Sequence, residues 1–383
     1  MSGGVDSSVA AYLLKKEGHD VFGLFMKNWD DENDPNCPAA EDSEDAAKVC
    51  SMLGIPFYAV EFVDEYRNNV FDTCLQEFKK GRTPNPDILC NSEIKFDRFL
   101  TKALEYGADA LATGHYARIG LDNNNVPTLL KGIDPSKDQS YFLHAIDRRA
   151  LRNVIFPIGG LYKSEIRKIA SEIGLPVAQK KDSTGICFIG ERKFKPFLNQ
   201  FIAYQTGKFK TLDGETVGEH QGCAFYTLGQ RRGLGLGGPG SRWFVVKKDL
   251  DANVVFVERG DDHAALFTED LETETINWLS DSIPEKPFDC QAKVRYRQED
   301  QFCTVFPPAD HRRARVVFHK KQRAVTPGQS IVFYDGEQCL GGGLIGSVGL
   351  SDWERQQISD SSYSFGSFAR TKQIESLRSG FSH

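Results

Sequence analysis

The first half of the chain alternates helical and strand-like segments, and this alternation limits the folds open to it. Apolar residues with helical spacing cover 7–17, 46–53, 66–80, 92–106 and 163–173. Short apolar runs typical of buried strands cover 21–26, 55–62 and 110–113. Glycine follows several of the helices, where a helix most readily ends. The pattern predicts an α/β fold with a doubly wound parallel sheet.

The pattern changes near residue 200, where glycine, proline and short β-like runs become frequent. These runs cover 243–247, 253–257, 291–297, 301–306, 315–318 and 330–334. They predict a small central β-rich domain and a C-terminal β-barrel. The predicted boundaries are 1–198 for the α/β domain, 199–272 for the central domain and 273–350 for the barrel. Residues 351–383 are Ser-rich and poorly periodic, and we expect a loose tail.

Composition narrows the function classes. The 383 residues carry a net charge of −6, so binding to nucleic acid would depend on local basic patches. No apolar run approaches the roughly 20 residues of a membrane span, and Met1 is not followed by a signal-peptide pattern. The nine cysteines include no Cys-x-x-Cys pair, which argues against a zinc site. We expect a cytoplasmic protein in a reducing compartment, with no membrane partner.

The first motif reads Ser2-Gly3-Gly4-Val5-Asp6-Ser7-Ser8 and leads into the first helix. Glycines allow close approach to a phosphate, which amides at the helix start and serine hydroxyls can bind. No Walker lysine follows, so the γ-phosphate clamp of kinases is absent. A buried strand normally precedes such a loop, whereas Met1 directly abuts it. We therefore expect the first strand of the domain to be missing.

The second motif, residues 81–91, places Cys90 after a stiff loop with two prolines. We predict a helix from about Ser92, so that Cys90 would lie just before the helix N-terminus, where a thiolate is favoured. Asp87 lies three residues earlier and could position the thiol or transfer a proton. A buried structural cysteine is the alternative.

The third motif, residues 180–190, places Cys187 after Lys180 and Lys181 on a segment flanked by glycines. Nearby lysines favour a thiolate, so Cys187 is a second candidate for a reactive cysteine. From this motif alone, a core cysteine is equally consistent.

Three further patterns have weaker meanings. Gly233, Gly235 and Gly238 spell G-x-G-x-x-G, but Pro239-Gly240 follows instead of a helix, so a flexible loop is favoured over a dinucleotide site. The segment 295–297 is predicted on a strand, with its two arginines on one face, suited to RNA or to solvent. The segment 311–323 holds six Lys or Arg and no acid, a candidate RNA footprint.

Together these motifs resemble the tRNA-specific 2-thiouridylases, a family of the PP-loop ATP pyrophosphatase superfamily with an adenine nucleotide alpha hydrolase-like domain. The resemblance covers about residues 1–349. It includes the segments 23–29, 112–118, 137–139, 227–231, 295–297 and 326–329.

The resemblance implies that ATP, with Mg²⁺, binds on Ser2–Ser8 with Met26 and Gly114 near the adenosine. No protein ligand for a metal is implied. The implied reaction adenylates the C2 oxygen of the wobble uridine of tRNA and releases pyrophosphate. Cys187 would carry a persulfide whose terminal sulfur attacks C2. Cys90 would then form a disulfide with Cys187 or release hydrogen sulfide, and Asp87 would be the acid/base.

The resemblance also implies partners and their contacts. Asn85, Pro86 and Asp87 would touch the target base of tRNAs of the Lys, Glu and Gln type. The sulfur donor would be a sulfur-relay protein or a cysteine desulfurase. Further positions match family contacts with tRNA: His115, Lys137, Asp138, Gln139, Arg295, Tyr296 and Gln329.

Three alternatives remain at this point. Another PP-loop adenylating enzyme, such as an amidotransferase-type or argininosuccinate synthetase, is disfavoured by the two motif cysteines and the β domains. An iron–sulfur tRNA thiolase should carry Cys-x-x-Cys ligands. A catalytically inactive RNA-binding protein would not need Asp87, Cys90 and Cys187.

Overall fold

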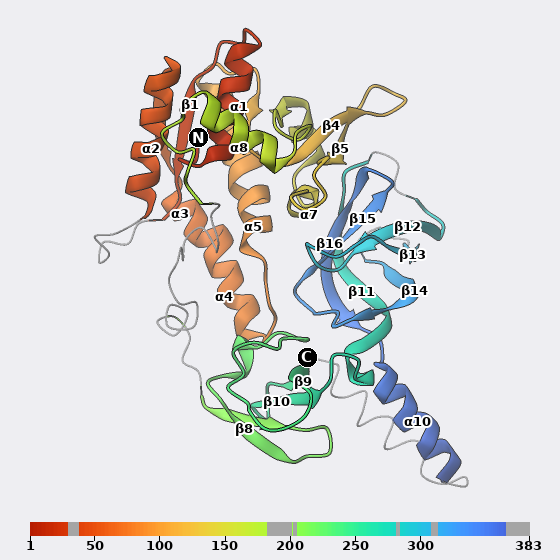
Figure 1. Cartoon of the computed structure of the whole chain (residues 1–383). Coiled ribbons are helices and arrows are strands. Elements are labelled where there is room, and N and C mark those ends of the chain that lie inside the picture. The colour runs from red at the N-terminus through yellow and green to blue at the C-terminus, as the bar shows by residue number, and fades with distance from the viewer. Residues whose placement is uncertain (30–37, 182–200, 202–204, 281–283, 308–312, 365–383) are drawn as a thin grey trace.

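The computed structural model describes residues 1–29, 38–181, 201, 205–280, 284–307 and 313–364. Figure 1 shows an N-terminal α/β domain, a central β domain at the opposite end of the molecule, and a β-barrel beside both. The helical run that ends with α4 extends from the α/β domain to the central sheet (Figure 1).

The N-terminal domain contains two pairs of parallel strands. They are β1 (Gly23–Lys27) with β2 (Phe57–Glu61), and β3 (Leu111–Ala112) with β6 (Val154–Ile155). The Met1 amino group donates to the Leu24 carbonyl of β1. The helices are α1 (Val5–Lys16), α2 (Pro38–Leu53), α3 (Val63–Tyr66), π-helix η1 (Arg67–Phe71), α4 (Asp72–Lys79), α5 (Pro86–Leu89), π-helix η2 (Cys90–Phe99), α6 (Leu100–Glu105), α7 (Ser140–Leu143), 3₁₀-helix η3 (Arg148–Asn153) and α8 (Lys163–Glu172).

Two apolar clusters line these strands. One joins α1, α2 and α8 through residues such as Val9, Val49 and Ile166. The other joins β1 to the helices of 63–105 through residues such as Leu24 and Ile94. Helices therefore cover both sides of the strands, and the predicted doubly wound α/β fold is confirmed.

Both long helices of the second cluster begin earlier than predicted. The run predicted at 66–80 spans α3, η1 and α4 and starts at Val63. The run predicted at 92–106 spans α5, η2 and α6 and starts at Pro86. Proline suits the first position of a helix, because its fixed φ matches and its missing N–H is not needed there.

The central domain is a four-stranded sheet in the order β8-β7-β10-β9. Its elements are β7 (Gly207–Lys210), β8 (Thr216–His220), 3₁₀-helix η4 (Cys223–Phe225), β9 (Trp243–Asp249) and β10 (Val254–Arg259). Buried residues of this sheet, such as Phe209 and Val255, belong to the same apolar cluster as Phe78 of α4. The central domain thus shares one core with the helices that carry the second motif.

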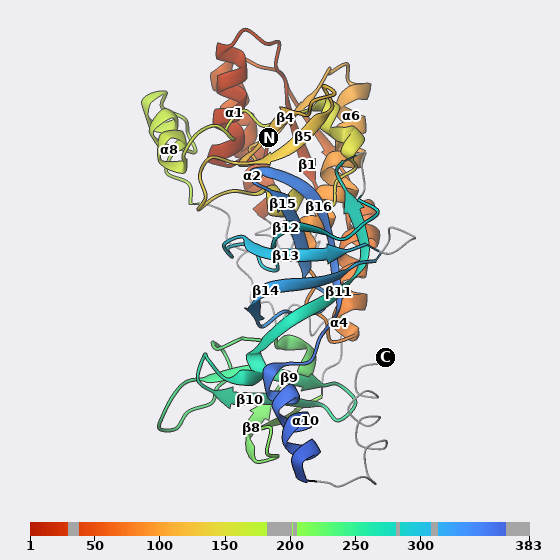
Figure 2. The ribbon, with the colours of Figure 1, turned by 90° about the vertical axis from the view of Figure 1, so that its right-hand side faces the viewer.

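The third domain is a closed barrel of six antiparallel strands. They are β11 (Phe267–Trp278), β12 (Phe288–Lys293), β13 (Gln301–Phe306), β14 (Arg315–Arg323), β15 (Ser330–Asp335) and β16 (Gln338–Val348), with 3₁₀-helix η5 (Ala264–Leu266) before β11. β11 pairs with both β14 and β16, which closes the barrel. The predicted barrel is confirmed. Figure 2 shows its strands between the α/β domain and the central sheet.

A hairpin of the α/β domain extends the barrel sheet, which the sequence did not predict. It consists of β4 (Ala117–Leu121) and β5 (Pro127–Lys131), and Leu130 of β5 pairs with Gln338 of β16. The first and third domains therefore share a sheet edge.

The predicted loose tail is wrong for residues 352–364, which form helix α10 (Asp352–Ser364). Ser351 and Glu354 form a capping box, because the Glu354 carboxylate accepts from the Ser351 amide at 2.9 Å and the Ser351 hydroxyl accepts from the Glu354 amide at 3.3 Å. Arg355 also pairs with Glu269 of β11.

Within the described part of the chain, no helix has the length and apolar character needed to cross a bilayer. Over the same residues, no group of three His, Cys, Asp or Glu side chains is placed to bind a metal ion.

The loop between β6 and α8 packs tightly on β4, and this predicts a sharp contrast between two adjacent glycines. A Cβ at Gly159 would lie 1.6 Å from the Ala117 carbonyl oxygen, whereas a Cβ at Gly160 would meet nothing within 4 Å. Gly159→Ala is expected to cost about 1–3 kcal/mol and lower the thermal midpoint by several degrees. Gly160→Ala is the control, and equal midpoints in the two variants would contradict this packing.

Candidate active site

The glycine-serine loop at the start of the chain forms a helix N-terminus without a side-chain cap. Gly4 precedes α1 and leaves the first-turn amides available to another acceptor. Gly3 has a φ of 68°, and a Cβ there would lie 2.3 Å from a backbone oxygen of α2. The Ser2 and Ser7 hydroxyls lie 3.0 Å apart, and the Ser8 hydroxyl donates to the Gly4 carbonyl at 2.8 Å. Amides and hydroxyls suited to a phosphate therefore gather here.

Asp6, in the first turn of α1, is tied to two other elements. Lys163 Nζ, at the start of α8, lies 2.8 and 2.9 Å from the two Asp6 carboxylate oxygens. The Tyr116 hydroxyl, between β3 and β4, donates to the same carboxylate at 2.8 Å. These contacts fix the loop and place a lysine beside it, a residue that the sequence analysis did not single out.

The end of β3 lies directly against the same loop. A Cβ at Gly114 would lie 2.6 Å from the Ser7 amide nitrogen, so only glycine fits without a shift. Met26, near the carboxyl end of β1, is half-buried against the core. The carboxyl ends of parallel strands are the usual ligand edge of such a sheet, and both predicted adenosine contacts belong to it.

The second motif begins with a capped helix rather than an open loop. The Asn85 side-chain oxygen Oδ1 accepts from the Asp87 backbone amide at 3.1 Å, and Pro86 occupies the first helical position. The helix therefore starts at Pro86, not near Ser92, and Cys90 lies in its second turn. The prediction of Cys90 just before a helix N-terminus is wrong, because the Asn-Pro signal was not used.

Cys90 is buried and faces the strand edge. It is 4% exposed, and the Asn28 amide nitrogen approaches its Sγ at 3.9 Å. Asn28 follows β1 directly, and its buried side-chain oxygen Oδ1 has no hydrogen-bond partner among the described residues. This asparagine was part of the family resemblance but not a predicted site residue, although its place after a buried strand was a usable signal.

Asp87, His115 and Lys95 form an electrostatically linked group on this edge. Burial raises the pKa of Asp87, and the Lys95 ammonium opposes that rise. Burial, reinforced by Lys95, holds the pKa of His115 well below its usual value, so the imidazole is neutral at physiological pH. Lys95 itself donates to Asn91 at 2.8 Å. Asp87 is thus closer to binding a proton near neutral pH than an exposed aspartate.

The segment before this helix is held by the central domain. Lys248 of β9 donates to the Gly81 carbonyl, and the Thr83 and Thr227 hydroxyls lie 3.1 Å apart. A Cβ at Gly81 would lie 2.4 Å from Leu250, which shows how closely this segment packs on the central sheet. Burial lowers the pKa of Lys248 to about 8.

The barrel holds the same segment from the other side. Arg82 Nη1 lies 2.6 Å from the Glu274 carboxylate of β11, and the side-chain amide of Gln329 donates to the Thr83 backbone carbonyl. A Cβ at Gly328 would lie 2.7 Å from the Arg82 Cβ. Gln329 therefore contacts the second motif directly, in addition to its predicted role toward tRNA.

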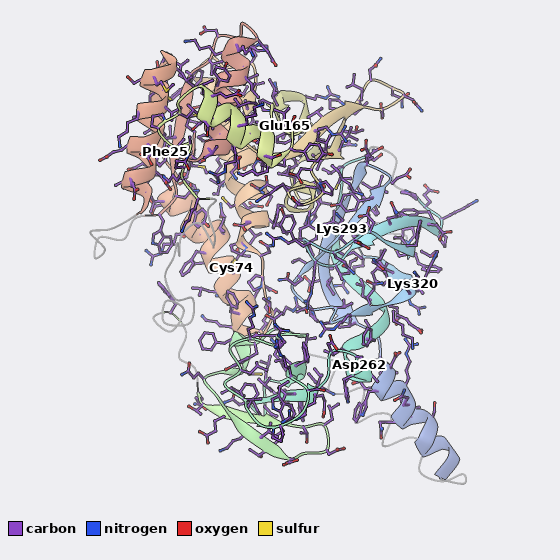
Figure 3. The ribbon with its side chains drawn as sticks, in the orientation of Figure 1. Phe25, Cys74, Glu165, Asp262, Lys293 and Lys320 are labelled. Carbon is purple, nitrogen blue, oxygen red and sulfur yellow. The ribbon has the colours of Figure 1, made fainter. Side chains whose placement is uncertain are left out.

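Asp138 is engaged inside the protein. It is 6% exposed, and its carboxylate accepts from the Gly132 and Ser140 amides at 3.0 and 3.1 Å. Lys293 of β12 lies 3.7 Å away across the domain boundary. Figure 3 labels Lys293 on the part of the barrel that adjoins α7. The carboxylate is thus bound within the protein, and the predicted contact of Asp138 with tRNA stays a prediction.

The neighbours of Asp138 are placed differently from it. The Gln139 side-chain oxygen accepts from the Tyr116 amide at 2.9 Å, which orients it toward the chain that follows His115. Lys137 is half-buried, and its carbonyl accepts from the Tyr296 hydroxyl at 3.3 Å. Of the three, Lys137 is the one whose side chain carries a positive charge, as a contact with an RNA phosphate requires.

Arg295 and Tyr296 do not lie on a strand, as the sequence predicted, but in a turn after β12. The turn forms because the Gln298 amide donates to the Arg295 carbonyl at 3.1 Å. Arg295 Nη2 donates to the Leu228 and Ala324 carbonyls at 2.7 and 2.8 Å, joining the central domain to the barrel. Both predicted RNA-contact residues thus also join domains.

The third motif is described only as far as Lys181. Lys180 Nζ lies 2.7 Å from both Asp42 and Asp45 of α2, so its charge is already paired within the protein. Cys187 lies outside the described residues. The prediction that Lys180 and Lys181 favour a Cys187 thiolate stays a prediction. Because Lys180 is paired with two carboxylates, its charge would stabilise that thiolate less than the sequence suggested.

Two of the six charges of the basic run 311–323 are paired with carboxylates of the protein. Arg315 pairs with Asp270 at 3.3 Å, and Lys321 pairs with Asp352 at 2.7 Å. Figure 3 places Lys320 on the side of the barrel away from α4. The run is therefore a weak candidate for an RNA footprint near the site.

The fold and this edge define a nucleotide-binding α/β domain followed by two β domains. Three family models match in the same order. They are described as a tRNA methyl transferase HUP domain over residues 1–191, a tRNA methyl transferase PRC-barrel domain over 195–259 and an Aminomethyltransferase beta-barrel domain over 268–345.

Curated relatives specify the family. The chain is 53% identical over 358 residues to the tRNA-specific 2-thiouridylase MnmA of Protochlamydia amoebophila, covering 93% of this chain and 95% of the relative. It is 55% identical over 349 residues to MnmA 2 of Geobacillus kaustophilus, covering 91% and 94%. It is 53% identical over 350 residues to MnmA of Bacillus subtilis, covering 91% and 94%. The chain belongs to the tRNA-specific 2-thiouridylase family, and the resemblance stated from the motifs is confirmed.

Substitutions at the adjacent residues Asp138 and Lys137 can distinguish a structural role from a contact with RNA. Asp138→Asn removes one of the two carboxylates beside Lys293, with Asp300 remaining at 3.6 Å, and weakens the bonds that the buried carboxylate accepts from backbone amides, so it is expected to cost about 1–3 kcal/mol of stability. Lys137→Ala is expected to lower the thermal midpoint less than Asp138→Asn does and to weaken binding of unmodified tRNA several-fold, because a phosphate contact is lost. Thermal melts and tRNA titrations at a temperature where both variants are folded distinguish the two. A normal midpoint for Asp138→Asn with weakened tRNA binding would contradict this assignment.

Proposed function

We propose that this protein is an ATP-dependent sulfurtransferase that converts the wobble uridine of tRNA to 2-thiouridine. One observation carries the proposal. The phosphate loop before α1, which has no side-chain cap, lies on the same edge of the α/β domain as Asp87 and Cys90. The relatives named above, which span nearly the whole chain, support the same substrate and product.

ATP is the proposed activating substrate. The α1 amides and the hydroxyls of Ser2, Ser7 and Ser8 would bind its phosphates, and Lys163 would add a positive charge beside them. Gly114 and Met26 would lie near the adenosine. Mg²⁺ would accompany the triphosphate and offset its charge. Attack of the uridine C2 oxygen on the α-phosphate would release pyrophosphate and convert a poor leaving group into AMP.

Sulfur delivery needs two thiols in this proposal. Cys187 would carry the persulfide, whose terminal sulfur attacks C2 and displaces AMP. Cys90 would then attack the Cys187 sulfur, forming a disulfide and leaving the second sulfur on C2. In the other route, Cys90 frees hydrogen sulfide from the persulfide as the nucleophile. The raised pKa of Asp87 supports its proposed role as the acid/base of these steps.

The uridine must leave the anticodon stack to reach Cys90, as other base-modifying enzymes require. Asn85, Pro86 and Asp87 would contact that base, and Lys137 the RNA backbone. A sulfur-relay protein or cysteine desulfurase would load Cys187. The tRNAs would be of the Lys, Glu and Gln type, and the site of action the cytoplasm.

Substitution of three cysteines tests the reaction. Wild type with unmodified tRNA, ATP, Mg²⁺ and a persulfide donor is expected to yield 2-thiouridine, measured by mass analysis of nucleosides. Cys187→Ala and Cys90→Ala are expected to abolish it, because each removes a thiol needed for sulfur transfer. Both should still release pyrophosphate, since adenylation needs neither thiol. Cys74→Ala, at another buried cysteine of the α/β domain, is the matched control.

Two outcomes would contradict the proposal. Thiolation that persists in Cys187→Ala would assign the sulfur to another carrier. Absence of both thiolation and tRNA-dependent pyrophosphate release in the wild type would favour an RNA-binding protein without this activity.

A further inference from the structure

The central domain contains a hollow that the site described above does not use. It measures about 410 Å³ and lies between the loop 231–242 and the start of the β9–β10 hairpin. Its lining includes Arg231, Arg232, Arg242, Trp243 and Arg259. This volume lies within the range of pockets that hold a nucleotide-sized ligand.

The hollow is lined by positive charges and by no negatively charged side chain. Four arginines and no carboxylate line it. Over the residues that the structure describes, no acidic side chain pairs with Arg231, Arg232 or Arg242. All three are exposed, in a chain whose net charge is −6. Unpaired guanidinium groups that converge on one hollow fit an anion, and a phosphate in particular.

Arg259 is fixed before any ligand binds. Its guanidinium lies 4.1 Å over the ring of Trp243, its partner on β9, and donates to the Ser241 carbonyl at 2.6 Å. Trp243 in turn donates to the Gly237 carbonyl at 3.1 Å. A Cβ at Gly238, where φ is 103°, would lie 2.9 Å from Arg259 Nη2. The loop is thus folded against a rigid arginine, which lowers the entropy cost of binding.

The hollow does not fit a dinucleotide site. No helix follows Gly238, because the chain continues through residues 239–242 into β9. The segment is a loop, as the sequence predicted. A phosphate would therefore be bound by arginines rather than by a helix N-terminus.

The loop starts where the central domain contacts the second motif. The Thr227 hydroxyl lies 3.1 Å from that of Thr83, and the Gln230 side chain links the Thr227 amide to the Arg232 carbonyl. Arg231 follows Thr227 by four residues, so their Cα atoms lie within about 15 Å of each other. The loop therefore continues from the part of the central domain that contacts the segment leading to Asp87 and Cys90.

We infer that the arginine-lined hollow of residues 231–242 and 259 binds a backbone phosphodiester of the substrate RNA. The inference rests on the proposed RNA substrate and adds a second point of attachment, on the central domain. Two contacts on separate domains would fix the direction in which the RNA leaves the active site.

Binding of unmodified tRNA between about 50 and 200 mM KCl tests this inference. Arg231→Ala/Arg242→Ala is expected to weaken binding about tenfold and to reduce the salt slope by about 1.4–1.8, as two lost phosphate contacts require. Arg231→Lys/Arg242→Lys should keep most of the slope because the charges remain. The control is Arg152→Ala, an exposed arginine of the α/β domain.

Unchanged affinity and slope in the double alanine variant, with a normal thermal midpoint, would overturn the inference. If that variant still produces 2-thiouridine in the nucleoside assay, the proposed function stands without this contact. A titration of wild type with inorganic phosphate, followed by tryptophan fluorescence, tests the other source of the anion. Saturation at micromolar phosphate would assign the hollow to a free anion and overturn the RNA assignment. A wild type that binds no tRNA would overturn both proposals.

Discussion

Residues Gly81–Thr83 are held by two other domains at once, and the geometry of the candidate active site depends on this constraint. Lys248 and Thr227 of the central domain contact the segment on one side, and Glu274 and Gln329 of the barrel contact it on the other. Two of these bonds end on backbone carbonyls, so they fix the path of the chain rather than one side chain. The helix with Asp87 and Cys90 begins three residues later, and its position is set from outside its own domain.

Contacts between domains also hold the other residues that match tRNA-contact positions of the family. Arg295 joins central-domain and barrel carbonyls, Tyr296 donates to the Lys137 carbonyl, and buried Asp138 faces Lys293. Breaking one partner of a buried charged pair is costly, so such contacts hold domains in a single arrangement. Residues that contact RNA in this family would then act on one rigid frame that includes the phosphate loop.

The sequence predicted the α/β class, the barrel and the phosphate loop, because apolar period and glycine placement are local signals. Prediction from the sequence failed where a helix start depends on a short capping motif, and where the burial or pairing of a side chain depends on tertiary contacts. Asn85-Pro86 begins a helix earlier than predicted, and the Ser351–Glu354 box begins a helix that was not predicted at all; both could have been read from local cap rules. The burial of Asp138 and the pairing of Lys180 with α2 depend on residues distant in sequence, and no pattern around them carries that information. Cys187, the other proposed thiol, lies outside the described residues.

The central claim is that the barrel positions the catalytic segment, and the Arg82–Glu274 pair tests it most directly. Glu274→Gln keeps the size of the side chain and removes the barrel's carboxylate charge at Arg82, leaving that of Glu77 within the α/β domain, while Glu272→Gln changes an exposed glutamate on the same strand. The measurement is the single-turnover rate of 2-thiouridine formation at saturating tRNA and ATP. The account predicts a rate at least about tenfold lower for Glu274→Gln, since small misplacements are costly in catalysis, with an unchanged thermal midpoint and a normal rate for Glu272→Gln. Equal rates in both variants would contradict the claim.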